Sequence, residues 1–253
     1  MTSYAVYYGA GRTSELKRFG LVVVRSESYG HDEVAWLRLH DTLVLAYASI
    51  GEDPQWRSGA SWYRTDPATG QPLRNETWGT YYVDIRDPAW QEQVLFGEVY
   101  DALDKGFDGL FLDTVDPCID VPYLAEAVPS LIGAIRQTLG RRLLIMNRGF
   151  GVLDTVLPVI DGVVFEAFSS RPVGNGYERW EGPDLAWTEV MARQLQVFQR
   201  ARRLAVFTLD YADMRDARLV QTLAQRARSF GFVPYVSTAK LDQLYLLPQT
   251  PGS

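Results

Sequence analysis

Acidic and amide side chains close several apolar, strand-like runs of this chain. The stretch GFDGLFLDTVD, residues 106–116, ends on Asp113 and Asp116. Later runs close on Asn147, on Glu166 and on Asp210 with Tyr211. A desolvated charge costs several kcal/mol unless it is paired or used. Two carboxylates facing one substrate are the groups that cleave glycosidic bonds, so Asp113 and Glu166 are predicted to form a catalytic pair.

The elements that must position these residues are short β-branched and aromatic runs. Most of the runs lack apolar/polar alternation, which is typical of strands buried on both faces. They cover residues 4–9, 21–24, 43–49, 109–113, 143–147, 162–166, 204–211 and 232–237. Helix-like segments separate them, and the clearest begins with Asp87 as N-cap and Pro88 as its first residue.

This alternation of strand and helix predicts an α/β fold, a (β/α)8 TIM barrel, as a single domain over residues 1–253. Active sites of such barrels lie at the carboxyl ends of the strands, where the polar residues stand. A doubly wound open sheet is the alternative, but GAGRTS after the first run supplies only two glycines of the G-x-G-x-x-G fingerprint.

A long aromatic loop follows the third strand, between Ser49 and Asp87, with no strong helix or strand signal beyond TYYVDI. Loops of this length in compact domains are functional or disordered, and the density of Trp and Tyr argues against disorder. The rings of Trp56, Trp62, Trp78 and Trp180 are predicted either to contact sugar rings or to pack within loops.

Other chemistries fit the residue inventory less well. The two histidines, His31 and His40, are predicted to be solvated or capping residues, and the one cysteine, Cys118, has no base beside it. A metal-dependent barrel enzyme is an alternative, with calcium or magnesium at three loop carboxylates. These carboxylates are Asp113, Asp116 and Asp120, but their spacing fits no EF-hand loop. We therefore predict no metal and no cofactor.

Composition limits the partners. The chain has 253 residues, a formal net charge of −6 and no basic block interleaved with aromatics, which makes nucleic acid an unfavoured partner. Its apolar runs are shorter than the roughly 20 residues of a membrane-spanning helix. The N-terminus, MTSYAVYYGAG, carries no export signal as given, although removal of a leader would leave the same sequence. Localisation and oligomeric state stay open.

Several blocks of the sequence resemble the endo-α-1,4-polygalactosaminidase family, glycoside hydrolase family 114. The blocks are YASIGEDPQWR, YYVDIRDPAWQ, KGFDGLFLDTVD, LLIMNRGF, GVVFEAFSS, FTLDYAD and FVPYVSTAKLD, and they run from the first strand to the eighth. The resemblance implies a (β/α)8 barrel that hydrolyses an α-1,4-linked polymer or oligomer of galactosamine or N-acetylgalactosamine. It also implies secretion.

The resemblance implies roles for individual residues. Asp113 corresponds to the nucleophile and Glu166 to the acid/base, by analogy with α-galactosidase-like barrels. Glu52 and Tyr211 would line the sugar subsites. The full set of predicted substrate-binding residues is Tyr8, Tyr47, Glu52, Trp78, Asp116, Asn147, Asp210 and Tyr211. A non-catalytic carbohydrate-binding barrel is the competing hypothesis. Such a protein would tolerate loss of either catalytic carboxylate, and the presence of both favours the enzyme.

Overall fold

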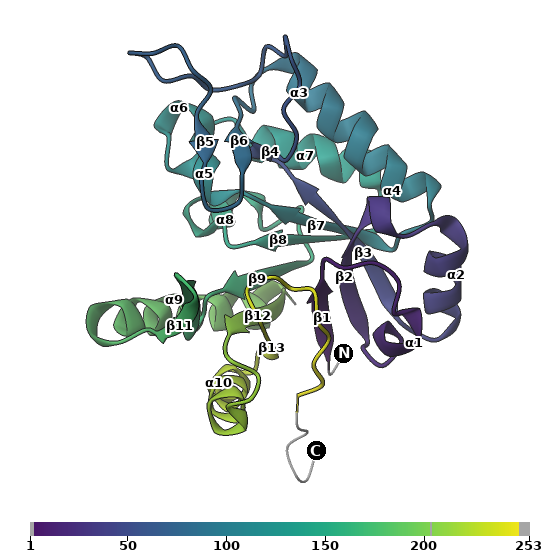
Figure 1. The fold of residues 1–253 in the computed structure, drawn as a ribbon, viewed down its shortest axis with the longest axis vertical. Helices are drawn as coiled ribbons and strands as arrows, with labels where there is room; N and C mark the ends of the chain where they lie inside the picture. The colour runs from purple at the N-terminus through teal and green to yellow at the C-terminus, as the bar shows by residue number, and fades with distance from the viewer. Residues whose placement is uncertain (1–2, 203, 248–253) are drawn as a thin grey trace. The chain divides into compact units, whose positions relative to one another are not determined.

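An eight-stranded sheet organises the chain in the computed structural model, which describes residues 3–202 and 204–247 (Figure 1). Its strands are β1 (Tyr4–Tyr7), β2 (Leu21–Arg25), β3 (Leu43–Ser49), β7 (Gly109–Asp113), β8 (Leu143–Asn147), β9 (Gly162–Glu166), β12 (Ala205–Tyr211) and β13 (Val233–Ser237). The order in the sheet is β1-β2-β3-β7-β8-β9-β12-β13, so each strand neighbours the next one along the chain. This order, with helices between the strands, confirms the predicted (β/α)8 fold class.

The chain divides into two compact units, residues 1–45 with 161–253 and residues 46–160, with one boundary inside β3. The predicted single domain over residues 1–253 stays a prediction. No helix in the described part of the chain is both long enough and apolar enough to cross a membrane.

The first unit contains β1 with β2 and, further along the chain, β9 with β12 and β13, all in parallel pairs. Its helical segments are α1 (Thr13–Leu16), η1 (Ser26–Ser28), α2 (His31–Leu39), α9 (Gly182–Arg202) and α10 (Ala217–Ser229), and a hairpin is formed by β10 (Ser170–Val173) and β11 (Gly176–Arg179). Tyr4 of β1 connects the two groups of strands, since its hydroxyl donates to the Thr208 carbonyl (2.8 Å) and its ring lies 4.8 Å from that of Phe207.

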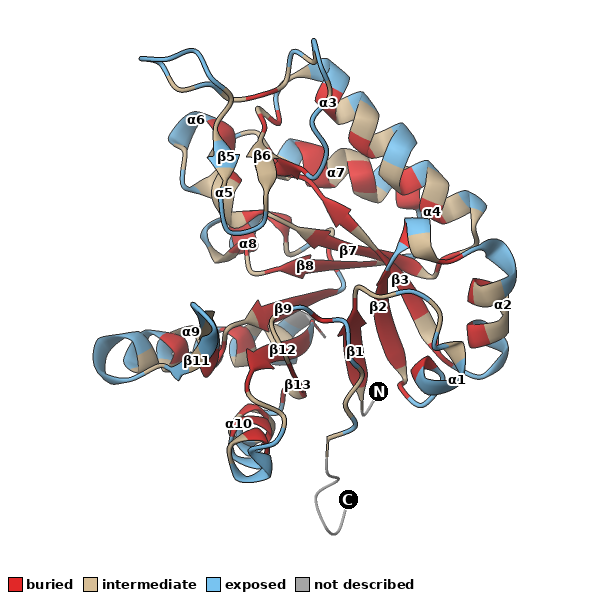
Figure 2. Ribbon diagram, in the orientation of Figure 1, coloured by how far each residue is buried: buried red, intermediate tan, exposed pale blue. Residues whose placement is uncertain are grey.

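Helix α10 shows how the sequence places an element on the sheet. The Asp216 side chain caps its first turn by accepting from the Leu219 N–H (3.0 Å). Val220 and Leu223 lie on the face that packs against Val236 of β13, and the opposite face is exposed (Figure 2). The apolar stripe at helical spacing therefore fixes which side of α10 is buried.

The second unit contains the end of β3 and the parallel pair β7–β8, whose central residues are buried (Figure 2). Its helical segments are α3 (Pro88–Glu92), η2 (Gln93–Val99), α4 (Tyr100–Asp104), α5 (Asp116–Ile119), α6 (Pro122–Ala125), α7 (Val128–Leu139), η3 (Phe150–Val152) and α8 (Leu153–Val156). The Asp87 carboxylate accepts from the Ala89 N–H (2.8 Å), which confirms the predicted N-cap. Segments α3, η2 and α4 follow one another without a break. The middle segment, η2, has π-helical hydrogen bonding, which the sequence did not indicate.

The long loop after β3 forms a small antiparallel sheet. Its strands are β4 (Glu52–Asp53), β5 (Arg74–Asn75) and β6 (Thr80–Tyr82), in the order β4-β6-β5. The sequence indicated only the last of these, because strands of two residues are too short to show periodicity. The loop is thus an ordered part of the second unit rather than irregular chain.

Candidate active site

Polar side chains end three consecutive strands of the sheet. Asp113 is the last residue of β7, Asn147 of β8 and Glu166 of β9, which confirms their predicted positions in the chain. The residue after each has a left-handed backbone conformation: Thr114 (φ 60°), Arg148 (φ 53°) and Ala167 (φ 53°). Non-glycine residues rarely adopt this conformation, and it concentrates at functional sites. The three strands therefore end in the same kind of turn.

In the second unit, Asp113 and Asn147 are hydrogen-bonded. The Asn147 Nδ2 atom donates to Asp113 Oδ1 at 2.8 Å, and Asn147 is buried. A hydrogen-bond donor to a carboxylate fixes the orientation of that carboxylate. Asn147 therefore positions the Asp113 side chain at the end of β7.

The turn after Asp113 is bound to the end of β3. The Gly51 N–H donates to Thr114 Oγ1 (2.8 Å), and the Ser49 hydroxyl lies 2.8 Å from the same oxygen. A Cβ atom on Gly51 would lie 2.1 Å from the Thr114 carbonyl oxygen, so this close approach requires glycine. These contacts hold the start of the long loop against the end of β7.

Asp116 is engaged by the turn after β8. Its carboxylate accepts from Arg148 Nε (2.6 Å) and from the Gly149 N–H (2.9 Å). No group of three His, Cys, Asp or Glu side chains suited to a metal ion occurs within residues 3–202 and 204–247. The structure therefore places Asp116 in an ion pair with Arg148.

Glu52 is buried (3% exposed) within the small sheet of the long loop. Its carboxylate accepts from Thr80 Oγ1 (2.5 Å) and Asn75 Nδ2 (3.1 Å). Trp78, in the turn between β5 and β6, is 59% exposed. Glu52 thus holds the turn that carries the exposed Trp78 indole.

In the first unit, Glu166 and Tyr211 are hydrogen-bonded. The Tyr211 hydroxyl donates to Glu166 Oε1 at 2.5 Å, and Tyr211 is buried. The chain after Glu166 is held by Trp180, whose Nε1 donates to the Ala167 carbonyl (2.6 Å). The structure therefore assigns Trp180 a structural contact, with its ring lying under the Arg171 guanidinium.

Asp210 is buried (1% exposed) beside the same turn. Its Oδ1 accepts from the backbone N–H groups of Ser169 (2.5 Å) and Ser170 (3.0 Å). Burial raises the pKa of Asp210 to about 7, although these N–H groups and Arg226 act in the opposite direction. Asp210 connects β12 to the chain that follows β9.

Two further predicted residues, Tyr8 and Tyr47, make ring contacts. Tyr47 of β3 packs near Phe111 of β7, with ring centroids 6.3 Å apart. The Tyr8 ring lies 5.2 Å from the Arg25 guanidinium in the first unit. Asp113 belongs to the second unit and Glu166 to the first.

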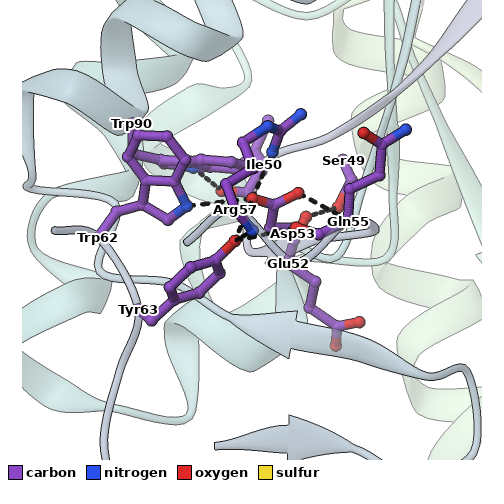
Figure 3. Close-up of polar contacts among 9 residues, drawn as sticks. All are labelled: Ser49, Ile50, Glu52, Asp53, Gln55, Arg57, Trp62, Tyr63 and Trp90. Carbon is purple, nitrogen blue, oxygen red and sulfur yellow. Dashed lines mark hydrogen bonds and ion pairs between the residues drawn. The ribbon is translucent and has the colours of Figure 1, made fainter. Parts of the chain in front are cut away.

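The sequence analysis did not identify Asp53, the neighbour of Glu52 in β4. Asp53 is fully buried and collects four hydrogen-bond donors from the long loop (Figure 3). The sequence did offer one signal for Asp53. It directly follows Glu52 in SIGEDP, so two carboxylates stand together shortly after an apolar run.

A cavity of about 780 Å³ also lies in the second unit. It is lined by Ser61, Tyr63, Arg64, Thr65, Pro67, Leu73, Asp84, Arg86, Asp87 and Tyr123. None of these is a predicted site residue, so the cavity does not locate the carboxylates.

A family model and several solved structures match nearly all of the chain. The model of glycoside-hydrolase family GH114 matches residues 2–251, which confirms the predicted resemblance. A Deinococcus radiodurans protein is 26% identical over 226 residues, 80% of this chain and 66% of the relative. The chain therefore spans about two thirds of that relative's length.

Solved structures resemble the whole chain. A variant of the glycoside hydrolase domain of PelA from Pseudomonas aeruginosa has a TM-score of 0.84 and 25% identity, covering 97% of this chain and 98% of that one. Aspergillus fumigatus Ega3 in complex with galactosamine has a TM-score of 0.70 and 16% identity, covering 95% and 92%. At 16% identity, the likeness to Ega3 shows a shared fold.

Proposed function

Because the chain belongs to glycoside-hydrolase family GH114, we propose that it hydrolyses α-1,4-linked polymers or oligomers of galactosamine or N-acetylgalactosamine. The observation that carries the proposal is the family match over residues 2–251, since it includes every strand end described above. The structural likeness to the PelA glycoside hydrolase domain supports glycoside hydrolysis, and the galactosamine complex of Ega3, which has the same fold, agrees with an amino-sugar substrate.

The proposed nucleophile is Asp113. It attacks the anomeric carbon, and the glycosidic C–O bond breaks as an ester forms between the sugar and the Asp113 carboxylate. The amide of Asn147, 2.8 Å away, supports this role because its hydrogen bond holds the carboxylate in one orientation.

The proposed acid/base is Glu166. As an acid it gives its proton to the leaving glycosidic oxygen, and as a base it then takes a proton from the water that cleaves the ester. The Tyr211 hydroxyl, 2.5 Å from Glu166 Oε1, supports this role by fixing the carboxyl group. A nucleophile followed by water gives a product with retained anomeric configuration.

The remaining predicted residues are proposed to bind the sugar chain. Trp78 offers an exposed indole, and Glu52 holds the turn that carries it. For the buried Asp210, we propose that it supports binding through the turn after β9. The other proposed binding residues are Tyr8, Tyr47, Asp116, Asn147 and Tyr211.

A panel of α-1,4-linked galactosamine and N-acetylgalactosamine oligomers tests the proposal, with α-1,4-linked glucose oligomers as the control substrate. The parent protein should release shorter amino-sugar oligomers. Asp113→Asn and Glu166→Gln should stay folded and lose several orders of magnitude in turnover, since each keeps its shape but loses an anion or a proton donor. Glu178→Gln, in an exposed pair with Arg171, is the matched control and should keep the parent rate.

Two outcomes would contradict the proposal. Hydrolysis by Asp113→Asn and Glu166→Gln at the parent rate would remove the two-carboxylate mechanism. Binding of the oligomers by the parent without any hydrolysis would favour the non-catalytic carbohydrate-binding barrel.

A further inference from the structure

Asp53 is the centre of a hydrogen-bonded cluster in the long loop. Its Oδ2 accepts from Trp62 Nε1 (3.1 Å) and from the Tyr63 hydroxyl (2.9 Å), and it forms an ion pair with Arg57. Its Oδ1 accepts from the Gln55 N–H (2.9 Å). Figure 3 shows these groups converging on one carboxylate, with the Glu52 side chain directed away from it.

The Tyr63 hydroxyl is fixed from several directions. It accepts from the Arg57 N–H (2.8 Å) and also lies 2.9 Å from the Gln55 carbonyl oxygen. Burial raises the pKa of Tyr63, and its hydrogen bond to Asp53 adds to that effect. These hydrogen bonds fix the position of the Tyr63 ring, and Asp53 accepts one of them.

Trp56 rests on this ring. The indole of Trp56 is stacked on Tyr63, with centroids 4.7 Å apart and planes at 20°, and its centroid lies 5.2 Å from that of Tyr81. Trp56 nevertheless remains 51% exposed. Trp62, in contrast, is bound to Asp53 and lies 5.6 Å from the Trp90 ring. Among these tryptophans of the loop, the structure leaves Trp56 with an open surface on a rigid support.

We propose that the exposed indole of Trp56 is a binding surface for a hexosamine ring, and that Asp53 is the positioning residue that holds this surface through Tyr63. The inference rests on the proposed function and adds a sugar-binding position to it. Pyranose rings present C–H faces that pack on an indole, and a ring that is already ordered loses little entropy when it binds.

The ion pair inside the cluster leaves no unpaired Asp53 charge to act on a sugar bound at Trp56. The Asp53 carboxylate is paired with Arg57, and the indole is stacked on the uncharged Tyr63 ring. Binding at Trp56 should therefore change little with ionic strength, because screening acts on unpaired charges.

The contacts that fix the end of β7 are separate from this cluster. Thr114 binds Ser49 and Gly51, and Asp113 binds Asn147, without a contribution from the Asp53 carboxylate. Loss of the Asp53 cluster should therefore weaken substrate binding and leave the chemical step intact. This separation gives the proposal a kinetic signature.

Steady-state kinetics on a long α-1,4-galactosamine oligomer test the proposal. Trp56→Ala should raise KM about tenfold and change kcat by less than about twofold. Asp53→Asn should raise KM by a similar factor, since its amide N–H₂ group must face either the Gln55 N–H or the donors at Oδ2. Tyr63→Phe keeps the stacked ring and removes only the hydroxyl, so a KM increase of about threefold is expected.

The double variant Asp53→Asn/Trp56→Ala separates positioning from general structure. If Asp53 acts through the indole, the double variant should match Trp56→Ala within about twofold in KM, whereas independent effects would multiply. Where Asp53→Asn does not fold, Tyr63→Phe with Trp56→Ala supplies the same cycle. Phe96→Ala is the matched control, because Phe96 is also exposed (61%) and stacked, on Tyr100 at 5.2 Å, and should keep the parent KM.

The outcomes distinguish this proposal from the proposed function. A parent that cleaves the oligomer while Trp56→Ala keeps its KM overturns this proposal alone. Multiplicative effects in the double variant, or a fall in kcat equal to the rise in KM, overturn the positioning role of Asp53. A parent that neither binds nor cleaves any amino-sugar oligomer overturns both.

Discussion

Replacement of the buried carboxyl of Asp210 should remove a large part of the pH dependence of stability. Burial raises the pKa of Asp210 from 3.8 to about 7. Between these values the folded protein keeps the proton that the unfolded chain has lost, so the free energy of unfolding falls as pH rises through this window. The stabilising contribution is fully present below pH 4 and is lost above pH 7.

The size of the effect follows from the change in pKa. A difference of about 3 pH units at 1.36 kcal/mol each gives about 4 kcal/mol between pH 4 and pH 7.5. Asp210→Asn is neutral across the window, and its Oδ1 can still accept from the N–H groups of Ser169 and Ser170. Between pH 4 and pH 7.5, the decrease in the free energy of unfolding should therefore be about 4 kcal/mol smaller for the variant than for the parent.

Denaturant unfolding at several pH values between 4 and 8 measures this difference. Asp213→Asn is the control: the hydrogen bond from Arg215 lowers the pKa of the exposed Asp213 to about 2, so its stabilising contribution is lost only below pH 4. The curve of that variant should run parallel to that of the parent. Parallel curves for the parent and Asp210→Asn would refute the argument.

Three further predictions concern the second unit. Cys118 is buried, which raises the pKa of its thiol to about 12, so a thiol reagent at pH 8 should modify it only after denaturation; modification of the folded protein would contradict this. A chelator should leave the hydrolysis rate unchanged, and a lost rate restored by calcium or magnesium would instead support the metal-dependent alternative at Asp113, Asp116 and Asp120. Trp78→Ala should weaken oligomer binding by about 1 kcal/mol at every salt concentration. Glu52→Gln should lower the salt dependence of binding to deacetylated oligomers and also weaken binding at high salt, because Glu52 holds the turn that carries Trp78. Titration calorimetry at low and high salt measures both effects, and unchanged affinity of both variants at every salt concentration would contradict these assignments.

The sequence predicted the features that depend on neighbouring residues. Each of the eight strands is a short apolar run that ends near a turn residue, so its place could be read directly. The cap at Asp87 depends on two adjacent residues, and the structure confirms it. The polar residues at the ends of β7, β8 and β9 could be read in the same way, because each directly follows an apolar run.

The remaining features depend on contacts between distant residues or on backbone conformation. The Tyr211 hydroxyl reaches Glu166 from 45 positions along the chain, and Asp53 gathers its partners through the fold of the loop. The left-handed turns use Thr114, Arg148 and Ala167, where glycine would have given a signal. None of these has a periodicity that a sequence could reveal.

Azide rescue is the measurement that tests the two carboxylate roles most directly. With an activated α-galactosaminide as substrate, Asp113→Ala with azide should give the β-glycosyl azide, because azide replaces the nucleophile on the face opposite the leaving group. Glu166→Ala with azide should give the α-glycosyl azide, because azide then displaces the sugar from its ester with Asp113. Nuclear magnetic resonance identifies each anomer. The same anomer from both variants, or hydrolysis by either variant at the parent rate, would contradict the assignment of Asp113 and Glu166.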